Sequence, residues 1–287
     1  MISYLRLVYY LLRPDTIFVR RTSNGLGDNL LLSMILPELR KKNPDRRIVV
    51  ETPWPELFAN NPNADWVTGL HMKTTRRHIK PRYHVEETTA VSIYEQTMAY
   101  IGEHRKAQPR LYLTDEETAG IRERYPFPYI ALCPTGERDF FANRKEWGLP
   151  NFQRLRDLLA GFQFVQIGLP GDPLLERVID GRELTVRETA AAIRQSLLFL
   201  GLEGGLMHLA RSVGSRAVII YGGLVRPEIS GYDENVNVYN AVPCSPCFHS
   251  DRRHEPCESM ACMKGISPEQ VFEIITSRLL PEQRLEV

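Results

Sequence analysis

Residues 197–214 combine an apolar run, two glycines and a histidine in an order that suits anion binding. The run 197–202 is short enough for a buried strand, Glu203-Gly204-Gly205 breaks it, and 206–213 is expected to be a helix. A glycine turn at a helix N-terminus presents backbone N–H groups and partial positive charge. His208, in the first helical turn, could reach the same anion. The alternative is a tight strand–helix turn with a packed histidine.

A second turn, Gly25-Leu26-Gly27-Asp28, also lies between an expected strand and an expected helix. It matches neither the dinucleotide-binding pattern nor the P-loop pattern, but its two glycines allow a ligand to approach the backbone closely. Asp28 at the head of the helix has two interpretations. It is either a general base that takes a proton from an attacking hydroxyl, or the N-cap of the helix.

Two further turns carry polar residues. Pro134-Thr135-Gly136 follows an expected buried strand, and Lys145 comes soon after. A hydroxyl, backbone amides and a lysine together suit a diphosphate. The segment 168–172 ends the next strand, and Asp172 at its end could hold a ribose hydroxyl.

Four of the five cysteines are close in sequence, at Cys244, Cys247, Cys257 and Cys262. The first pair has the spacing of thiolate metal sites. In a reducing compartment such a cluster more often binds a metal than forms disulfides, and zinc and iron both accept four sulfurs. The cluster predicts a structural metal site, and its alternative is packing without metal or free thiols.

Strands alternating with helices must position these turns. Strands are expected at 16–20, 47–51, 65–70, 110–113, 129–133, 162–167, 197–202, 217–221 and 235–239, and helices among other places at 29–42, 88–102, 174–179 and 185–195. This alternation predicts an α/β protein with parallel sheets, whose strand ends and turns face a cleft. Two prolines at 126 and 128 separate two series of elements. Domains are therefore expected at 1–126 and 127–266, the second with a cysteine loop at 244–262, followed by a C-terminal helix within 267–287.

Composition narrows the classes of protein. The formal net charge of +1 gives no support for a nucleic-acid binder, and no apolar run approaches the roughly 20 residues that span a bilayer. The basic segment 71–87 is expected to be a loop, either solvated or facing an acceptor. Arg6 and Arg13 interrupt the N-terminal apolar segment and no cleavage site follows, so a cytoplasmic location is expected. That segment is expected to be a helix, packed on the protein or lying peripherally on a membrane surface.

The order of these motifs resembles that of the heptosyltransferases of glycosyltransferase family 9. The matching pieces are IFVRRTSNGLGDNLLLSMILPELRKKNP, CPTGERDFFANRKEWGLPNFQRL, VQIGLPGDP, EGGLMHLARSVGSRAVIIYGG and the CSPC…CM tail. The resemblance implies a GT-B fold of two Rossmann-like domains, with the acceptor domain first, the nucleotide-sugar domain second and a C-terminal helix crossing back to the first. It also implies inverting, metal-independent transfer of a heptose from ADP-heptose to a lipid-linked sugar, a protein hydroxyl or a small molecule.

By the same resemblance, Asp28 matches the family's proposed base. The donor positions that carry over are Thr135 and Lys145 near the phosphates, Glu203, Gly204, Gly205 and His208 around the diphosphate, and Asp172 and Leu184 near the ribose and adenine. The family usually has Asp followed by Thr or Ser where this chain has Glu203-Gly204, so phosphate binding is expected to depend more on backbone amides. Two alternatives stay open: a GT-B transferase for another nucleotide sugar, and a non-catalytic nucleotide-sugar binder whose cysteine loop docks a partner.

Overall fold

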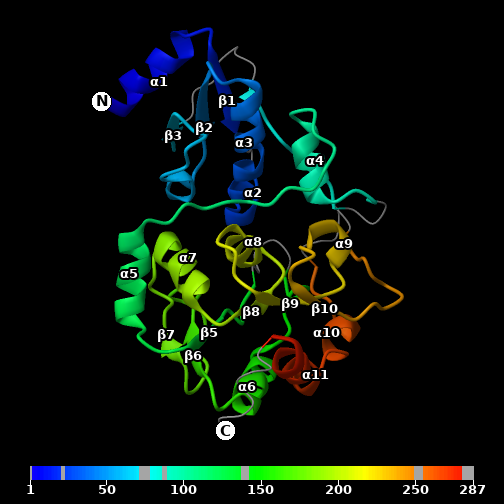
Figure 1. The fold of residues 1–287 in the computed structure, drawn as a ribbon. Helices are drawn as coiled ribbons and strands as arrows, with labels where there is room; N and C mark the ends of the chain where they lie inside the picture. The colour runs from blue at the N-terminus through cyan, green and yellow to red at the C-terminus, as the bar shows by residue number, and fades with distance from the viewer. Residues whose placement is uncertain are drawn as a thin grey trace.

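A computed structural model describes residues 2–20, 23–70, 78–85, 89–136, 142–248 and 255–279. Within these residues the strands form two parallel sheets, one of four and one of six strands, which lie one above the other in Figure 1. We call the part built on the first sheet, with α1 to α4 and η1, the N-terminal lobe. The part built on the second sheet, with α5 to α11, is the C-terminal lobe. The expected α/β class is confirmed.

The first sheet has the strand order β3-β2-β1-β4. Its strands are β1 (Thr16–Arg20), β2 (Arg47–Glu51), β3 (Trp66–Thr68) and β4 (His78–Ile79). The bounds of β1 and β2 are those expected from the sequence, and β3 is shorter. Strand β4 was not expected, because it lies in the basic segment that lacks an apolar pattern. Most of that segment, 71–77 and 86–87, lies outside the described residues.

Helices cover both faces of this sheet. They are α1 (Ile2–Leu12), α2 (Leu26–Leu30), α3 (Leu32–Lys42), the 3-10 turn η1 (Pro55–Phe58) and α4 (Ile93–Ala99). On one face, Leu7 and Tyr10 of α1 pack against Phe18 and Val49 of the strands. The expectation that the N-terminal helix packs on the protein body is thus confirmed. The other face packs against α3, and the helix expected at 29–42 begins earlier, at Leu26, with a break at Leu31.

The second sheet has the strand order β10-β9-β8-β5-β6-β7. Its strands are β5 (Tyr129–Leu132), β6 (Gln163–Gln166), β7 (Ile179–Asp180), β8 (Phe199–Leu202), β9 (Ala217–Tyr221) and β10 (Val236–Tyr239). The strand expected at 110–113 does not form, because this segment connects the lobes and Leu111 N donates to Ser212 O instead. The helix expected at 174–179 does not form either. The buried side chain of Gln166 binds the backbone of Pro173 and Leu175 there, in an irregular turn.

Helices also cover both faces of the second sheet. They are α5 (Asp115–Arg124), α6 (Leu149–Leu158), α7 (Val186–Gln195), α8 (Gly205–Ser212), α9 (Pro227–Ser230), α10 (Ala261–Lys264) and α11 (Pro268–Ile274), which a π-helical turn, η2 (Ile275–Leu279), continues. Helices α7 and α8 pack on one face, and α6 and α11 on the other. The capping box that Thr185 and Glu188 predict at the start of α7 is confirmed.

The C-terminal helix does not take the path that the resemblance implies. Val271 and Ile275 are buried with Phe152 and Leu155 of α6, at the end of the molecule farthest from the N-terminal lobe (Figure 1). The burial of these apolar side chains keeps residues 268–279 on the C-terminal lobe, so the described part of the helix makes no crossing. Residues 280–287 lie outside the described part of the chain.

Helix α5 precedes the boundary expected at 126/127 but packs against α7 of the C-terminal lobe. The packing of α5 thus places it in the C-terminal lobe, and the domain boundary at 126/127 stays a prediction. Among the described residues, no helix has both the length and the apolar character that crossing a membrane requires.

Candidate active site at the junction of the lobes

The two glycine turns meet where α2 of the N-terminal lobe packs against α8 of the C-terminal lobe (Figure 1). A β-carbon built on Gly205 would be 3.4 Å from the backbone nitrogen of Gly27, and one built on Gly27 would be 3.2 Å from Cα of Gly205. Glycine at both positions therefore permits this approach of the two helices. As a result, Asp28 of α2 lies beside the turn expected to bind the donor.

Asp28 lies inside the first turn of α2, which has Gly25 as its N-cap, so the N-cap interpretation of Asp28 is wrong. Buried Asn29 fixes this turn, since its Nδ2 donates to the carbonyl oxygens of Ser23 and Gly25, each at 2.9 Å. The hydroxyl of Tyr83 donates a hydrogen bond to Oδ1 of Asp28. The half-buried carboxylate is therefore held in one orientation at the lobe junction.

A cavity of about 350 Å³ lies between the lobes, within the size range of small-molecule sites. Leu26 and Trp54 of the N-terminal lobe form part of its wall. The C-terminal lobe contributes most of the predicted donor residues, namely Thr135, Gly136, Lys145, Asp172, Leu184, Glu203, Gly204 and Gly205. Residues from four separate turns thus converge on one cavity.

The polar groups of this cavity hold one another in place. Lys145 Nζ lies 2.5 Å from Glu203 Oε2, and only 12% and 11% of these side chains are exposed. Asp172 Oδ2 accepts hydrogen bonds from Thr135 Oγ1 and from the backbone N–H of Leu169, both at 2.8 Å. Lys145 is the one cation among the described residues of the lining.

Gly204 has a backbone conformation that favours glycine. Its φ of 151° and ψ of −159° belong to a region that side chains other than glycine rarely adopt. In any α-helix the backbone N–H groups of the first turn face its N-terminal end. No side chain caps α8 at that end. The turn thus leaves these amides without a side-chain cap, and their recognition of an anion stays a prediction.

His208 does not line the cavity. Its ring is buried at the junction of the lobes, where Nδ1 lies 2.7 Å from the hydroxyl of Tyr232 and the ring edge faces Gly27. Burial lowers the pKa of His208 to about 4, while the carboxylates of Glu203 and Asp28 oppose the shift. The ring is neutral at physiological pH and fixes the packing of α8 rather than contributing charge to the cavity.

The predicted metal site is not formed by the described residues. Cys244 is exposed, Cys262 is buried, and Cys247 and Cys257 are half-buried. Within the described ranges, no group of three or more Cys, His, Asp or Glu side chains is arranged to hold a metal ion, so the predicted site has no support from this geometry. Residues 249–254, with two histidines, lie outside those ranges.

The cysteine loop instead contacts the segment that leads to Lys145. Asn143 donates to the carbonyl oxygen of Cys257 at 3.0 Å and accepts from its N–H at 2.8 Å. Arg144 donates to the carbonyl oxygen of Glu255 at 2.8 Å and to Sγ of Cys247 at 3.4 Å. These bonds hold the backbone on one side of the donor cavity. Cys133 is buried, as expected, and burial raises its pKa to about 11.

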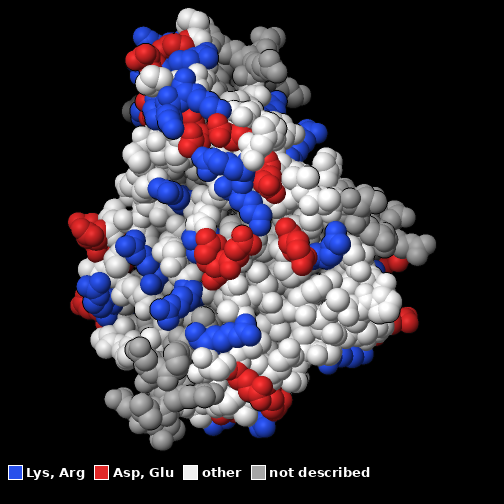
Figure 2. Space-filling model, turned by 45° about the vertical axis from the view of Figure 1, so that its right-hand side comes forward, with Lys and Arg blue, Asp and Glu red and all other residues white. Residues whose placement is uncertain are grey.

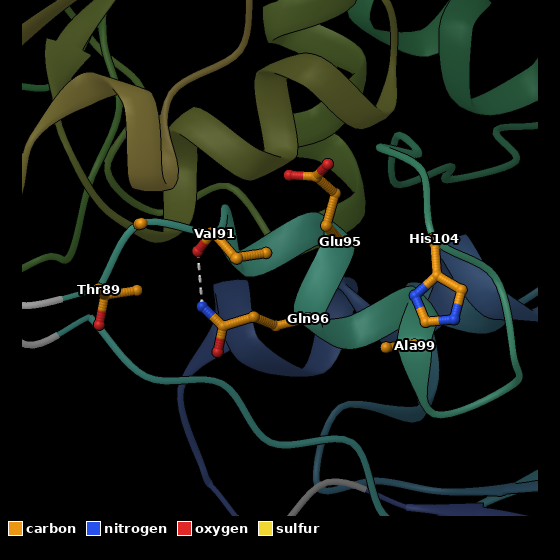
Figure 3. A pocket seen from close by; sticks show the side chains of 7 residues that line it. Thr89, Val91, Glu95, Gln96, Ala99 and His104 are labelled. Atoms are coloured by element: carbon orange, nitrogen blue, oxygen red, sulfur yellow. Dashed lines mark hydrogen bonds between the residues drawn. The ribbon is translucent and has the colours of Figure 1, made fainter.

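A second cavity, of about 480 Å³, lies on the outer side of α4 (Figure 3). Figure 3 shows Gln96 turned toward Val91, to whose carbonyl oxygen Nε2 donates at 2.8 Å, and Glu95 and His104 near the rim. None of the residues nominated for chemistry lines this cavity. All of its lining residues lie between 89 and 104 in the sequence.

Charge on the face drawn in Figure 2 is mixed, with acidic and basic side chains interspersed over the upper part of the molecule. Charged side chains of the described residues bind one another and, in one case, a backbone oxygen of the N-terminal lobe. Lys106 lies 3.3 Å from Asp233, and Arg187 donates to Glu117 and to the carbonyl oxygen of Glu56. The described face thus carries no single-sign patch of the kind that binds nucleic acid.

Two α/β lobes, each built on a parallel sheet, enclose a cavity of the size that a nucleotide needs. This is the architecture of a GT-B glycosyltransferase. The sequence profile described as glycosyltransferase family 9 (heptosyltransferase) matches residues 69–258, and the chain belongs to this family. The chain is therefore a glycosyltransferase, as expected from the sequence. Comparison of the sequence with curated proteins gives no match.

Solved structures of the family share the fold at low sequence identity. A family 9 glycosyltransferase from Veillonella parvula is similar with a TM-score of 0.71 and 16% identity, over 94% of this chain and 98% of the other. The ADP-heptose LPS heptosyltransferase II of E. coli gives 0.69 and 15%, over 93% and 99%. The iron-containing dodecameric glycosyltransferase TibC of E. coli gives 0.69 and 17%, over 91% and 75%. These likenesses confirm the GT-B fold.

Three residues of the site were not predicted, namely Asn29, Trp54 and Tyr83. Each follows the carboxyl end of a strand of the first sheet: Asn29 after β1, Trp54 after β2 and Tyr83 after β4. Ligands of open α/β sheets bind at these strand ends, so position relative to the strands is the signal that could have found them.

Proposed function

We propose that this glycosyltransferase transfers a heptose from ADP-heptose to an acceptor hydroxyl, with inversion at the anomeric carbon and without a catalytic metal. The observation that carries the proposal is the convergence of the predicted donor residues on one cavity, with Asp28 at the neighbouring junction. Two solved heptosyltransferases with this fold are described as acting on, or binding, an ADP-heptose.

The donor diphosphate is placed against Lys145 and the first turn of α8. Negative charge grows on the diphosphate as its bond to the sugar breaks, and fixed positive groups stabilise that charge. The ammonium of Lys145 and the backbone amides behind Gly205 are such groups. Glu203 holds Lys145 in the cavity before the donor arrives. Asp172 and Leu184 are assigned to the ribose and the adenine.

Asp28 is assigned as the general base. Its carboxylate takes the proton of the acceptor hydroxyl as the acceptor oxygen bonds to the anomeric carbon. The bond from that carbon to the diphosphate breaks on the opposite face, so the configuration inverts and ADP leaves with the bonding pair. Tyr83 keeps the carboxylate oriented for this transfer. Closure of the lobes excludes water and prevents hydrolysis of the donor.

The test of this assignment is a pair of variants. Asp28→Asn is expected to abolish transfer while ADP binding stays near that of the wild type. Lys145→Ala is expected to weaken ADP by about 1–3 kcal/mol, since a charge-assisted hydrogen bond is lost. Full activity of Asp28→Asn would remove Asp28 from the base role, and unchanged affinity of Lys145→Ala would remove Lys145 from the phosphate site.

Two alternatives have sequence features in their favour. The Glu203-Gly204 departure favours a GT-B transferase for another nucleotide sugar, or a binder without turnover. The affinities of ADP, UDP and GDP, measured by calorimetry, show which nucleobase the donor carries. Transfer or slow hydrolysis of ADP-heptose distinguishes an enzyme from a binder.

The acceptor is assigned by class, as a lipopolysaccharide-core sugar or a protein hydroxyl, reached in the cytoplasm. Peripheral attachment to the inner membrane is part of this proposal. Leu5, Tyr9 and Leu12 of α1 are exposed, next to Arg6 and Arg13, which suits an anionic interface. Sedimentation with anionic vesicles is expected for the wild type and is expected to weaken in a Leu5→Ser, Leu12→Ser double variant. Equal sedimentation of the two proteins would remove α1 from this role.

A further inference from the structure

The donor cavity has two chemically different parts. Its charged residues, Lys145, Asp172 and Glu203, come from turns that follow strands of the second sheet. Its apolar residues include Leu184 and Val186 at the start of α7 and Leu209 of α8. A nucleoside diphosphate has the same division, with charge on the phosphates and a flat, weakly polar base. The apolar part is therefore the place for the base.

The N-terminal lobe covers this apolar part with Trp54. The indole lines the cavity, and Trp54 immediately precedes η1, which packs on α7. Arg187 of α7 donates from Nη1 to the carbonyl oxygen of Glu56 in η1 at 2.8 Å, which fastens the two elements together. Trp54 therefore lies near the start of α7, where Leu184 and Val186 also line the cavity.

The orientation of the indole is fixed by its own hydrogen bond. Nε1 donates to the carbonyl oxygen of Asn24 at 2.7 Å. That bond uses the polar edge of the ring, while part of the side chain packs against the hydrophobic core and the rest stays accessible. Trp54 is half-buried, and Phe199, the other aromatic residue of the lining, is fully buried beneath the cavity. Trp54 is thus the one partly accessible aromatic side chain among the described lining residues.

We propose that Trp54 is the wall of the nucleobase subsite contributed by the N-terminal lobe, and that its ring stacks on the base of the bound donor. The inference rests on the proposed function, because it places a nucleoside diphosphate in this cavity. Stacking depends on the aromatic face and not on the hydrogen-bonding edge of the base, so Trp54 supplies affinity while residues of the C-terminal lobe choose the base. The nucleotide site is then complete only when both lobes surround it.

Tryptophan fluorescence tests the contact directly. The chain has three tryptophans, and neither Trp66, which stacks on Tyr10, nor Trp147, whose Nε1 donates to the carbonyl oxygen of Ile266, lines the cavity. ADP is expected to quench the emission of the wild type and of Trp66→Phe. The quenching is expected to disappear in Trp54→Phe, which lacks the indole; its Kd for ADP is expected to lie between those of the wild type and Trp54→Ala, because a ring is kept but the hydrogen bond to Asn24 is lost.

Calorimetry with ligands that do and do not carry a base gives the second readout. Trp54→Ala is expected to raise the Kd of ADP about tenfold or more and to leave that of inorganic pyrophosphate unchanged. Quenching that persists in Trp54→Phe, together with an unchanged Kd in Trp54→Ala, overturns the assignment of Trp54. A wild-type protein that binds none of ADP, UDP and GDP overturns instead the proposed donor.

Discussion

Gly27 of α2 lies so close to His208 of α8 that a β-carbon on Gly27 would be 2.6 Å from Cδ2 of the imidazole. The ring cannot move away easily, because Tyr232 binds its Nδ1 and the side chain is buried. Since Asp28 is the next residue along α2, this contact sets the distance between the proposed base and the donor cavity. The closeness of the lobes thus depends on the absence of a single methyl group.

Gly27→Ala is therefore expected to separate α2 from α8 and to reduce activity. A displacement of about 1 Å from the reactive geometry costs up to about a hundredfold in rate, so kcat is expected to fall at least about tenfold. Steady-state kinetics with ADP-heptose measure the loss.

Gly120→Ala in α5 is the matched control, because a β-carbon there would meet no atom within 4 Å. It is expected to keep full activity and to raise the free energy of unfolding by about 0.5–1 kcal/mol, since alanine favours a helix more than glycine does. A Gly27→Ala enzyme with the kcat of the wild type would show that the lobes need not approach this closely.

Tyr83→Phe removes the hydrogen bond that orients the carboxylate of Asp28. We expect kcat to fall about tenfold, as for the loss of one hydrogen bond to a charged group, while the KM for the donor stays unchanged. The exposed Tyr100→Phe is the control and is expected to behave like the wild type. A donor KM that rises with no change in kcat would place Tyr83 in donor binding instead.

The convergence of the turns of the C-terminal lobe on one cavity could be predicted from the sequence because each turn is local. Glu203-Gly204-Gly205 sits between a buried strand and a helix, and Pro134-Thr135-Gly136 follows another buried strand. In a parallel sheet such turns share one edge, so their convergence follows from the alternation of elements alone. The pattern of apolar residues in β1, β2 and α7 is also local, and it predicts the bounds of those elements to within about one residue.

The rest depends on contacts between residues distant in sequence. The partners Tyr83 and Asp28 come from different strand ends, and no local pattern pairs them. His208 has a helical position compatible with the cavity, but packing between the lobes turns it toward Gly27 and Tyr232. The spacing of the cysteines predicts a metal site, whereas the contact that the described geometry shows is one between the backbone of Cys257 and the side chain of Asn143, which no local pattern predicts.

The stability of the protein is expected to depend on pH through His208. Burial lowers its pKa to about 4 in the folded protein, against an ordinary value of about 6.5 in the unfolded chain. The unfolded chain thus binds more protons between these values. The contribution of neutral, buried His208 to the free energy of unfolding is therefore complete above pH 6.5. It is lost as the pH falls toward 4, by up to about 3 kcal/mol.

Chemical denaturation at pH 7 and at pH 4.5 measures this loss in the wild type and in His208→Asn. Asparagine does not titrate in this range, and its amide is able to bond to Tyr232. The variant is expected to lose less stability between the two pH values than the wild type does. An equal loss in both proteins would assign the pH dependence to carboxylates elsewhere.

Glu203→Gln is expected to tighten the binding of ADP. Glu203 neutralises Lys145 at 2.5 Å in the cavity, and its negative charge opposes the diphosphate. Removing that charge leaves the full charge of Lys145 for the phosphates, so the Kd of ADP is expected to fall about three- to tenfold at low salt, with a smaller gain at high salt. Glu203→Asp keeps the charge and is expected to stay within about twofold of the wild type. Weaker binding by Glu203→Gln, in calorimetry at both salt concentrations, would show that the carboxylate accepts hydrogen bonds from the nucleotide itself.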